Sequence, residues 1–100
     1  TGKTINVVVA QNDEMAIGAY NSIAAAGKQN DIPVVGIDAI ADALKSVEDG
    51  GLLCTVFQNA TAQSQTAIDV AVQAAQGEEV DDWYDVPFEL VTSENVADYK

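Results

Sequence analysis

The sequence contains no histidine and a single cysteine, Cys54. Without histidines or a cysteine cluster it lacks the usual ligand sets for zinc or another soft metal, so we predict no metal site and no cofactor. The lone cysteine cannot form a disulfide within the chain. Its position in the apolar run 52–57 instead indicates a buried, unreactive thiol.

Basic residues are also scarce, with four Lys and Arg against sixteen Asp and Glu, which gives a formal net charge of −12. Nucleic-acid binding requires clustered Lys and Arg, so this composition excludes a nucleic-acid partner. An anionic membrane surface is disfavoured for the same reason. The apolar runs are all shorter than the roughly 18 to 20 residues that a membrane-spanning helix needs.

Signatures of catalysis are missing as well. There is no histidine to act as a general base, no glycine-rich phosphate loop and no G-x-S-x-G motif. The turns that follow the expected strands lack the G-x-G-x-x-G spacing that would bring a pyrophosphate onto backbone amides. Carboxylates are plentiful, but nothing pairs two of them with an activated nucleophile. The sequence therefore predicts a protein that is not an enzyme.

What the chain does contain is a regular alternation of apolar strand and helix patterns. Hydrophobic residues make up 48% of its 100 residues, enough for one small domain with a core. Strands that alternate with helices favour a parallel sheet with helices packed on its faces, so the expected class is α/β with a mostly parallel sheet. The expected strands cover residues 5–10, 34–37, 52–57 and 86–91, and the expected helices run from Asp13 as cap to Gly27, from Ile40 to Gly50 and over 60–76.

A polar residue follows each of the first three strands: Asn12, Asp38 and Gln58. In open α/β sheets, ligands bind beyond the carboxyl ends of the strands, where these residues are expected to lie. A carboxylate can accept hydrogen bonds from two adjacent hydroxyls, and an amide can accept one and donate another. Together these groups suit a neutral polyol. Helix capping and turn formation are the alternative roles for the same residue types.

Three stretches of the chain closely resemble the bacterial periplasmic sugar-binding proteins of the ribose- and galactose-binding type. They are Val9–Ala19, which contains Gln-Asn-Asp-Glu-Met-Ala, then Ile32–Asp38, which ends in Val-Gly-Ile-Asp, and then Leu52–Asn59. The resemblance implies that Asn12, Asp38 and Gln58 hydrogen-bond sugar hydroxyls, with Asn59 as the alternative to Gln58.

The resemblance also implies an architecture and partners. Family members have two α/β lobes, each a three-layer sandwich, and the sugar is enclosed as the hinge closes. The chain resembles most of the second lobe, with residues 1–85 as a sugar-binding half and 86–100 as a hinge-crossing strand and tail. The implied ligand is a monosaccharide such as ribose, galactose or glucose. The implied partner is the membrane permease of an ABC importer, in the periplasm or outside the cell, with the parent protein either free or lipid-anchored.

Two further expectations follow from the resemblance. Half a cleft encloses little of a ligand, so we expect this chain alone to bind sugar very weakly or not at all, and to pair with a missing first lobe or a second copy. The effector-binding domain of a LacI-type transcription regulator is the alternative function, because that family shares the fold. The stretch from Gly50 to Phe57 is closer to the transporter pattern than to the regulator's Pro-x-Leu-Thr-Thr-Val.

Overall fold

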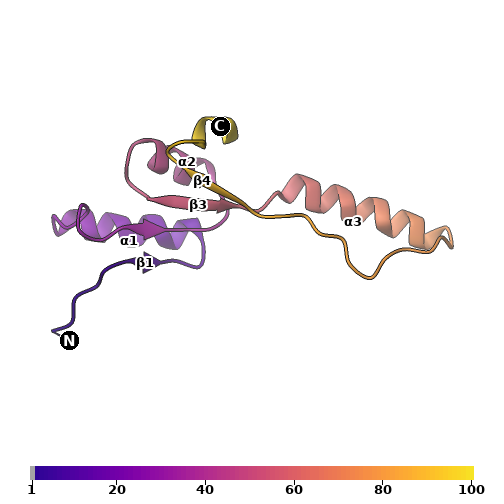
Figure 1. The fold of residues 1–100 in the computed structure, drawn as a ribbon, viewed down its shortest axis with the longest axis horizontal. Helices are drawn as coiled ribbons and strands as arrows, with labels where there is room; N and C mark the ends of the chain where they lie inside the picture. Colours follow the sequence, from indigo (N-terminus) through magenta and orange to yellow (C-terminus); the bar gives the residue numbers. More distant parts are fainter. Residues whose placement is uncertain (1) are drawn as a thin grey trace. The chain divides into compact units, whose positions relative to one another are not determined.

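The computed structural model describes residues 2–100, and the chain divides into two compact units. Unit 1 joins the residues up to Phe57 with the segment Glu89–Lys100, and unit 2 is the intervening segment Gln58–Phe88. Figure 1 shows the elements of both units in chain order. The elements are β1 (Val8–Val9), α1 (Asp13–Ala25), β2 (Val34–Val35), α2 (Ala41–Glu48), β3 (Cys54–Phe57), α3 (Ala60–Ala75), β4 (Glu89–Thr92) and the 3₁₀ helix η1 (Val96–Tyr99).

Unit 1 contains a four-stranded sheet in the order β1-β2-β3-β4. The first three strands are parallel, with Val9 opposite Val35 and Val35 opposite Cys54. The last strand, β4, is antiparallel to β3 and pairs Thr55 with Val91. The expected α/β class with a mostly parallel sheet is confirmed.

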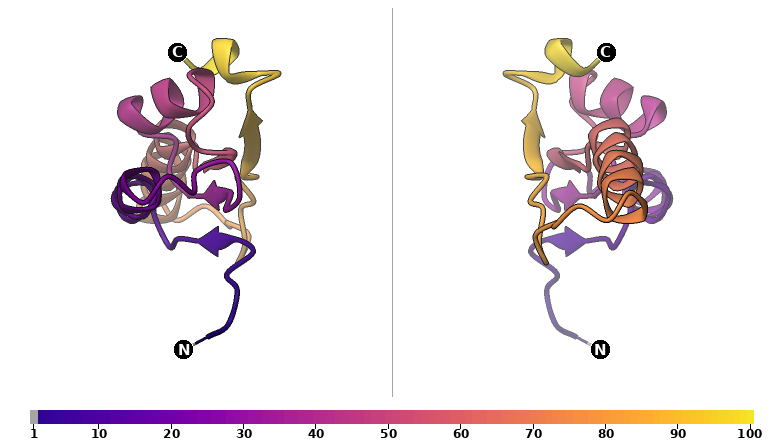
Figure 2. Two further views of the ribbon diagram at one scale, coloured as in Figure 1. Left: turned by 90° about the vertical axis from the view of Figure 1, so that its left-hand side faces the viewer. Right: turned by 90° about the vertical axis from the view of Figure 1, so that its right-hand side faces the viewer.

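Helix α1 connects β1 to β2, and α2 connects β2 to β3. The two helices lie on the same side of the sheet (Figure 2). Crossovers between parallel strands are right-handed, and the chain steps through β1, β2 and β3 in one direction. Successive right-handed crossovers in one direction must place their helices on one face. In unit 1 this leaves the opposite face of the sheet to be covered by something other than α1 and α2.

Side chains on the sheet face that α1 and α2 cover are buried, and those on the opposite face are more exposed. Val34, Thr55 and Val91 point to the helix side and are fully buried. On the other side, Val9 is 71% exposed and Leu90 is 58% exposed. Helices were expected to pack on both faces of the sheet, but within unit 1 they cover one face only. The hydrophobic core consists of Ala10, Ala16, Val34, Ala43, Leu44, Val47, Leu52, Val91 and Val96.

The start of α1 corrects one detail of the sequence interpretation. Asn12 is the N-cap, in an extended conformation, and its side chain accepts a hydrogen bond from the Met15 N–H. Asp13 was expected to cap this helix, but it is the first helical residue and is completely buried. Because Asn12 makes the cap hydrogen bond, the carboxylate of Asp13 is not the helix cap.

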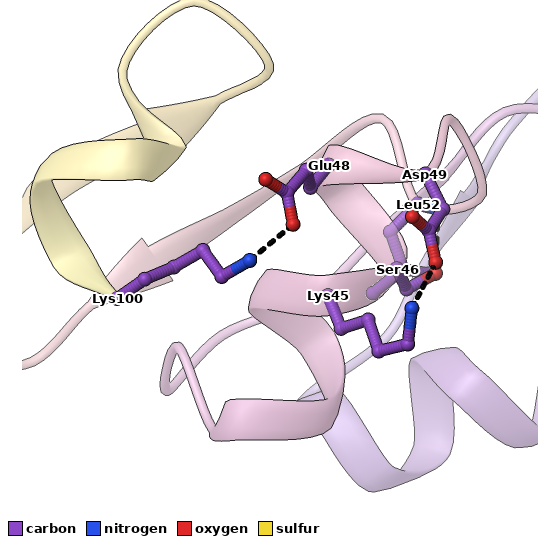
Figure 3. A network of polar contacts seen from close by, with 6 residues as sticks. All are labelled: Lys45, Ser46, Glu48, Asp49, Leu52 and Lys100. Carbon is purple, nitrogen blue, oxygen red and sulfur yellow. Dashed lines mark hydrogen bonds and ion pairs between the residues drawn. The ribbon is translucent and has the colours of Figure 1, made fainter.

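The end of α2 shows how the chain turns into β3. Gly50 has a φ of 85°, a left-handed conformation that glycine adopts without steric cost, and it stops the helix as expected. The Ser46 hydroxyl then accepts a hydrogen bond from the Leu52 N–H at 3.0 Å. Two exposed ion pairs, Lys45–Asp49 and Lys100–Glu48, lie around this turn and stabilise it little because water screens them (Figure 3).

Unit 2 consists of α3 and the connector that follows it. The Asn59 side chain caps α3 by accepting a hydrogen bond from the Ala62 N–H at 3.0 Å. None of the residues of α3 is buried, and Ile68 and Val72 on its apolar stripe are 65% and 50% exposed. Across residues 2–100, no helix has both the length and the apolar character to cross a membrane.

Candidate functional site

The register of the parallel strands brings the ends of β1 and β2 to matching positions. Val9 pairs with Val35, and Asn12 and Asp38 each lie three residues beyond a member of that pair. The sheet therefore carries both residues past the carboxyl ends of adjacent parallel strands, as predicted. This edge of an open α/β sheet is where such folds bind ligands.

Asn12 has a structural role in addition to its position at the sheet edge. Its Oδ1 accepts the Met15 N–H at 2.9 Å and so closes the first turn of α1. That bond fixes the orientation of the amide, and the Nδ2 hydrogens are the donors that remain for a hydroxyl oxygen. Asn12 therefore does cap the helix, which was the alternative role expected from the sequence. Capping uses its oxygen, so the same side chain can still bind a sugar through its nitrogen.

Asp38 lies in an unusual backbone conformation directly beyond β2. Its φ is 127°, and that of Ala39 is 61°, both in the region that residues other than glycine seldom adopt. The Asp38 N–H donates to the Val56 carbonyl at 2.8 Å, and a parallel bridge joins Asp38 to Phe57. Asp38 is exposed in unit 1, so its edge of the sheet is accessible to a ligand.

Gln58 follows Phe57 directly and is the first residue of unit 2. It is half-buried, as is Asn59, whose side-chain oxygen is the cap of α3. The assignment of Gln58, with Asn59 as its alternative, as the third sugar-binding residue stays a prediction.

Asp13 and Thr55 form a buried polar pair beneath this site that the sequence analysis missed. Both are completely buried, and the Thr55 hydroxyl donates to Oδ1 of Asp13 at 2.6 Å. Oδ2 of Asp13 accepts the Ile40 N–H at 2.9 Å, and Oγ1 of Thr55 accepts the Ala39 N–H at 3.2 Å. The pair thus binds the two backbone amides that come immediately after Asp38.

The fit around Asp13 is tight. A Cβ atom added to Gly36 of the turn after β2 would lie 2.4 Å from Asp13 Oδ1, far inside van der Waals contact. Glycine at position 36 therefore lets α1 approach the sheet closely enough for its first residue to reach the turn. The sequence signal for a buried Asp13 was its place on the apolar stripe that continues at Ala16 and Tyr20.

Cys54 lies on β3 and has a free, partly buried thiol. Partial burial raises the pKa of Cys54, which lowers the thiolate fraction at neutral pH and makes it a poor nucleophile. Within residues 2–100, no cluster of three or more Cys, Asp or Glu residues is arranged to hold a metal ion.

A pocket of about 630 Å³ lies within unit 2, between α3 and the connector. Trp83, Tyr84 and Phe88 contribute its aromatic lining, and Trp83 is 78% exposed. The lining does not include the predicted sugar-binding residues.

A known protein family matches most of the chain. The family described as "Periplasmic binding protein domain" matches residues 1–79. This range includes all three predicted sugar-binding residues, together with Asp13 and Thr55.

Individual relatives agree with this match. The chain is 44% identical over 100 residues to a putative rhizopine-binding protein of Rhizobium meliloti, covering 99% of this chain and 32% of that protein. It is 40% identical over 87 residues to a ribose import binding protein of Salmonella typhimurium, covering 87% of this chain and 29% of that protein. The chain thus spans about a third of the length of the curated relatives it matches.

A solved structure matches nearly the whole chain. An ABC transporter solute-binding protein from Bacillus halodurans with bound myo-inositol is 52% identical, with a TM-score of 0.89. The match covers 98% of this chain and 34% of that protein. The two curated relatives and this structure are binding proteins by name, and none of the three names describes an enzyme.

Proposed function

We propose a sugar-binding function for this chain, starting from the premise that it belongs to the periplasmic binding protein domain family. The full-length protein, meaning the complete product of the reading frame that contains these residues, acts as the solute-binding component of an ABC importer. It binds a neutral monosaccharide or a related cyclic polyol between two lobes. This chain contributes most of the second lobe, and the protein catalyses no reaction.

The observation that carries this proposal is the matched position of Asn12 and Asp38 beyond β1 and β2. The Asp38 carboxylate accepts from two neighbouring hydroxyls, the Asn12 amide donates to a third oxygen, and Gln58 adds a further donor and acceptor. Such a set recognises a ring with several adjacent hydroxyls and no charge. It also disfavours an anionic ligand, because the only ionised member is itself negative.

The partners and location follow from the same function. A binding protein of this family delivers its ligand to a membrane permease, which places the mature protein in the periplasm or outside the cell. Residues 86–100 form the segment that crosses between the lobes and the tail that follows it, and residues 1–85 form the sugar-binding half. The relatives are binding proteins, which does not favour the LacI-type alternative.

The affinity of the isolated chain is expected to be very low. Asp38 is exposed in unit 1, whereas good small-molecule sites bury ~70–90% of the ligand surface. The first lobe is needed to exclude water from the hydrogen bonds that these residues make, and a second copy of this chain is the alternative source of that cover.

Titration calorimetry on the full-length protein tests the proposal. We expect one or more of D-ribose, D-galactose, D-glucose and myo-inositol to bind with a Kd of about 10 μM or tighter, as enclosed polar sites achieve. D-Glucuronate is the matched control, since it keeps the ring hydroxyls of D-glucose and adds a negative charge. It should bind at least about tenfold more weakly than D-glucose if D-glucose binds.

Failure of all four sugars to bind, or tighter binding of an anion, would contradict the proposed ligand class. The isolated 100-residue chain, titrated in parallel, should give no measurable heat at millimolar sugar. Strong binding by this chain alone would show that the first lobe is not needed.

A further inference from the structure

A completely buried carboxylate on the helix side of the sheet requires an explanation. Burial of an ionised carboxyl is costly unless hydrogen bonds replace its hydration. Within residues 2–100, the lysine–carboxylate ion pairs are Lys45–Asp49 and Lys100–Glu48, and neither involves Asp13. The partners of Asp13 are neutral donors, the Thr55 hydroxyl and the Ile40 N–H.

The groups that Asp13 and Thr55 bind all belong to one turn. The N–H groups of three consecutive residues, 38, 39 and 40, are each tied to a different acceptor. The Asp38 N–H donates to the β3 backbone, the next N–H to the Thr55 hydroxyl oxygen, and the third to the Asp13 carboxylate. The pair therefore supplies the acceptors for two of these three N–H groups.

The turn needs that support because its backbone is strained. Asp38 and Ala39 have φ values of 127° and 61°. Such conformations raise the free energy of the folded state in a residue that has a Cβ atom. Strained residues persist only where the surroundings fix them, and they cluster at ligand sites. Here the strain lies at the residue whose carboxylate is the central hydrogen-bond acceptor of the proposed site.

We propose that Asp13, acting through Thr55 and the 39–40 amides, is a positioning residue that holds Asp38 in its sugar-binding conformation. Asp13 is buried and does not touch the sugar. This inference rests on the proposed function, because it assigns Asp13 a role at the same site. A loosened turn leaves only part of the population competent to bind, and the measured affinity falls by that fraction.

The test uses the full-length protein and the tightest-binding sugar of the four titrated above. Asp13→Asn keeps the shape of the side chain and removes its charge, and Thr55→Val keeps the shape and removes the hydroxyl. We expect each to raise Kd by about fivefold to 100-fold, the penalty for a turn no longer held in a strained conformation. Thr55→Ser restores the hydroxyl, and its Kd should stay within about threefold of the wild-type value.

A double-variant cycle separates positioning from general destabilisation. If Asp13 acts through Asp38, then Asp13→Asn combined with Asp38→Ala should bind no more weakly than Asp38→Ala alone. Val47→Ala is the matched control, because Val47 is a buried α2 residue that makes none of the side-chain bonds to the turn. It should lower the unfolding temperature while leaving Kd within about twofold.

Two results would overturn this inference and leave the sugar-binding function standing. One is an unchanged Kd in both Asp13→Asn and Thr55→Val while Asp38→Ala weakens binding. The other is full additivity of Asp13→Asn and Asp38→Ala in the cycle. An unchanged Kd in Asp38→Ala itself would contradict the proposed site instead, so the two failures are distinguishable. Should Asp13→Asn fail to fold, Thr55→Val and its serine counterpart decide the matter.

Discussion

Replacement of Asp38 by alanine in the full-length protein is expected to weaken sugar binding by ~2–5 kcal/mol, which is about 30-fold to several thousand-fold in Kd. The reason is that a pair of sugar hydroxyls loses its charged acceptor inside a closed cleft, where water cannot replace it. Calorimetric titration of wild type and variant with the same sugar measures the difference directly.

Asp42→Ala is the matched control for this prediction. Asp42 is also an exposed carboxylate, but it lies in the first turn of α2 instead of at a strand end. Its removal makes the same change in net charge, and Kd should stay within about twofold because Asp42 is not one of the predicted sugar contacts and salt screens its exposed charge. Equal losses of affinity in the two variants would attribute the effect to net charge and would remove Asp38 from the site.

Replacement of Leu52 by alanine is expected to lower the free energy of unfolding of this chain by ~2–5 kcal/mol. Leu52 is only 2% exposed and belongs to the core of unit 1, so the change creates a cavity there. A small domain has ~5–15 kcal/mol of stability in total, so the loss is a large share of it. Urea unfolding followed by circular dichroism should show the midpoint falling by about 1 M or more.

The neighbouring Leu53 provides the control for Leu52. It carries the same side chain, but it is 58% exposed. Leu53→Ala should change the unfolding free energy by less than ~0.5 kcal/mol, as is usual for surface substitutions. Similar losses in the two variants would mean that the core of unit 1 is not built around Leu52 as described.

The sequence predicted the helices better than the strands. The start of α3 matches the expected residue 60, and α1 begins one residue earlier than expected, at Asp13 itself, because polar strand ends and caps mark both starts closely. The first strand was expected over residues 5–10 but covers Val8–Val9. An apolar run gives no signal for where hydrogen bonding to a neighbouring strand stops, because that depends on the partner strand, and β2 is itself only two residues long.

The last strand shows the same limit. It was expected over residues 86–91 but covers Glu89–Thr92, where it pairs antiparallel with β3. The register is set by the partner strand, with Phe57 opposite Glu89 and Cys54 opposite Thr92. The tail after it contains the short 3₁₀ helix η1.

The sequence likewise predicted one part of the candidate site and missed another. The positions of Asn12 and Asp38 at one sheet edge could be predicted, because strand and helix lengths alone bring them there. The roles of Asp13 and Thr55 could not, because their hydrogen bond joins residues 42 positions apart and becomes visible only when α1 packs on β3. Asn and Asp are equally good helix caps, so local preference could not decide between Asn12 and Asp13. In the structure Asn12 is the cap, and the Asp13 carboxylate bonds the Thr55 hydroxyl and the Ile40 N–H.

The central claim is that a sugar binds at the carboxyl ends of β1 and β2, and a crystal structure of the full-length protein with its tightest-binding sugar tests it most directly. We predict both Asp38 carboxylate oxygens within about 2.5–3.0 Å of adjacent sugar hydroxyls, and the Asn12 amide within hydrogen-bond distance of another sugar oxygen. A sugar bound elsewhere, with Asp38 contacting only solvent, would contradict the account.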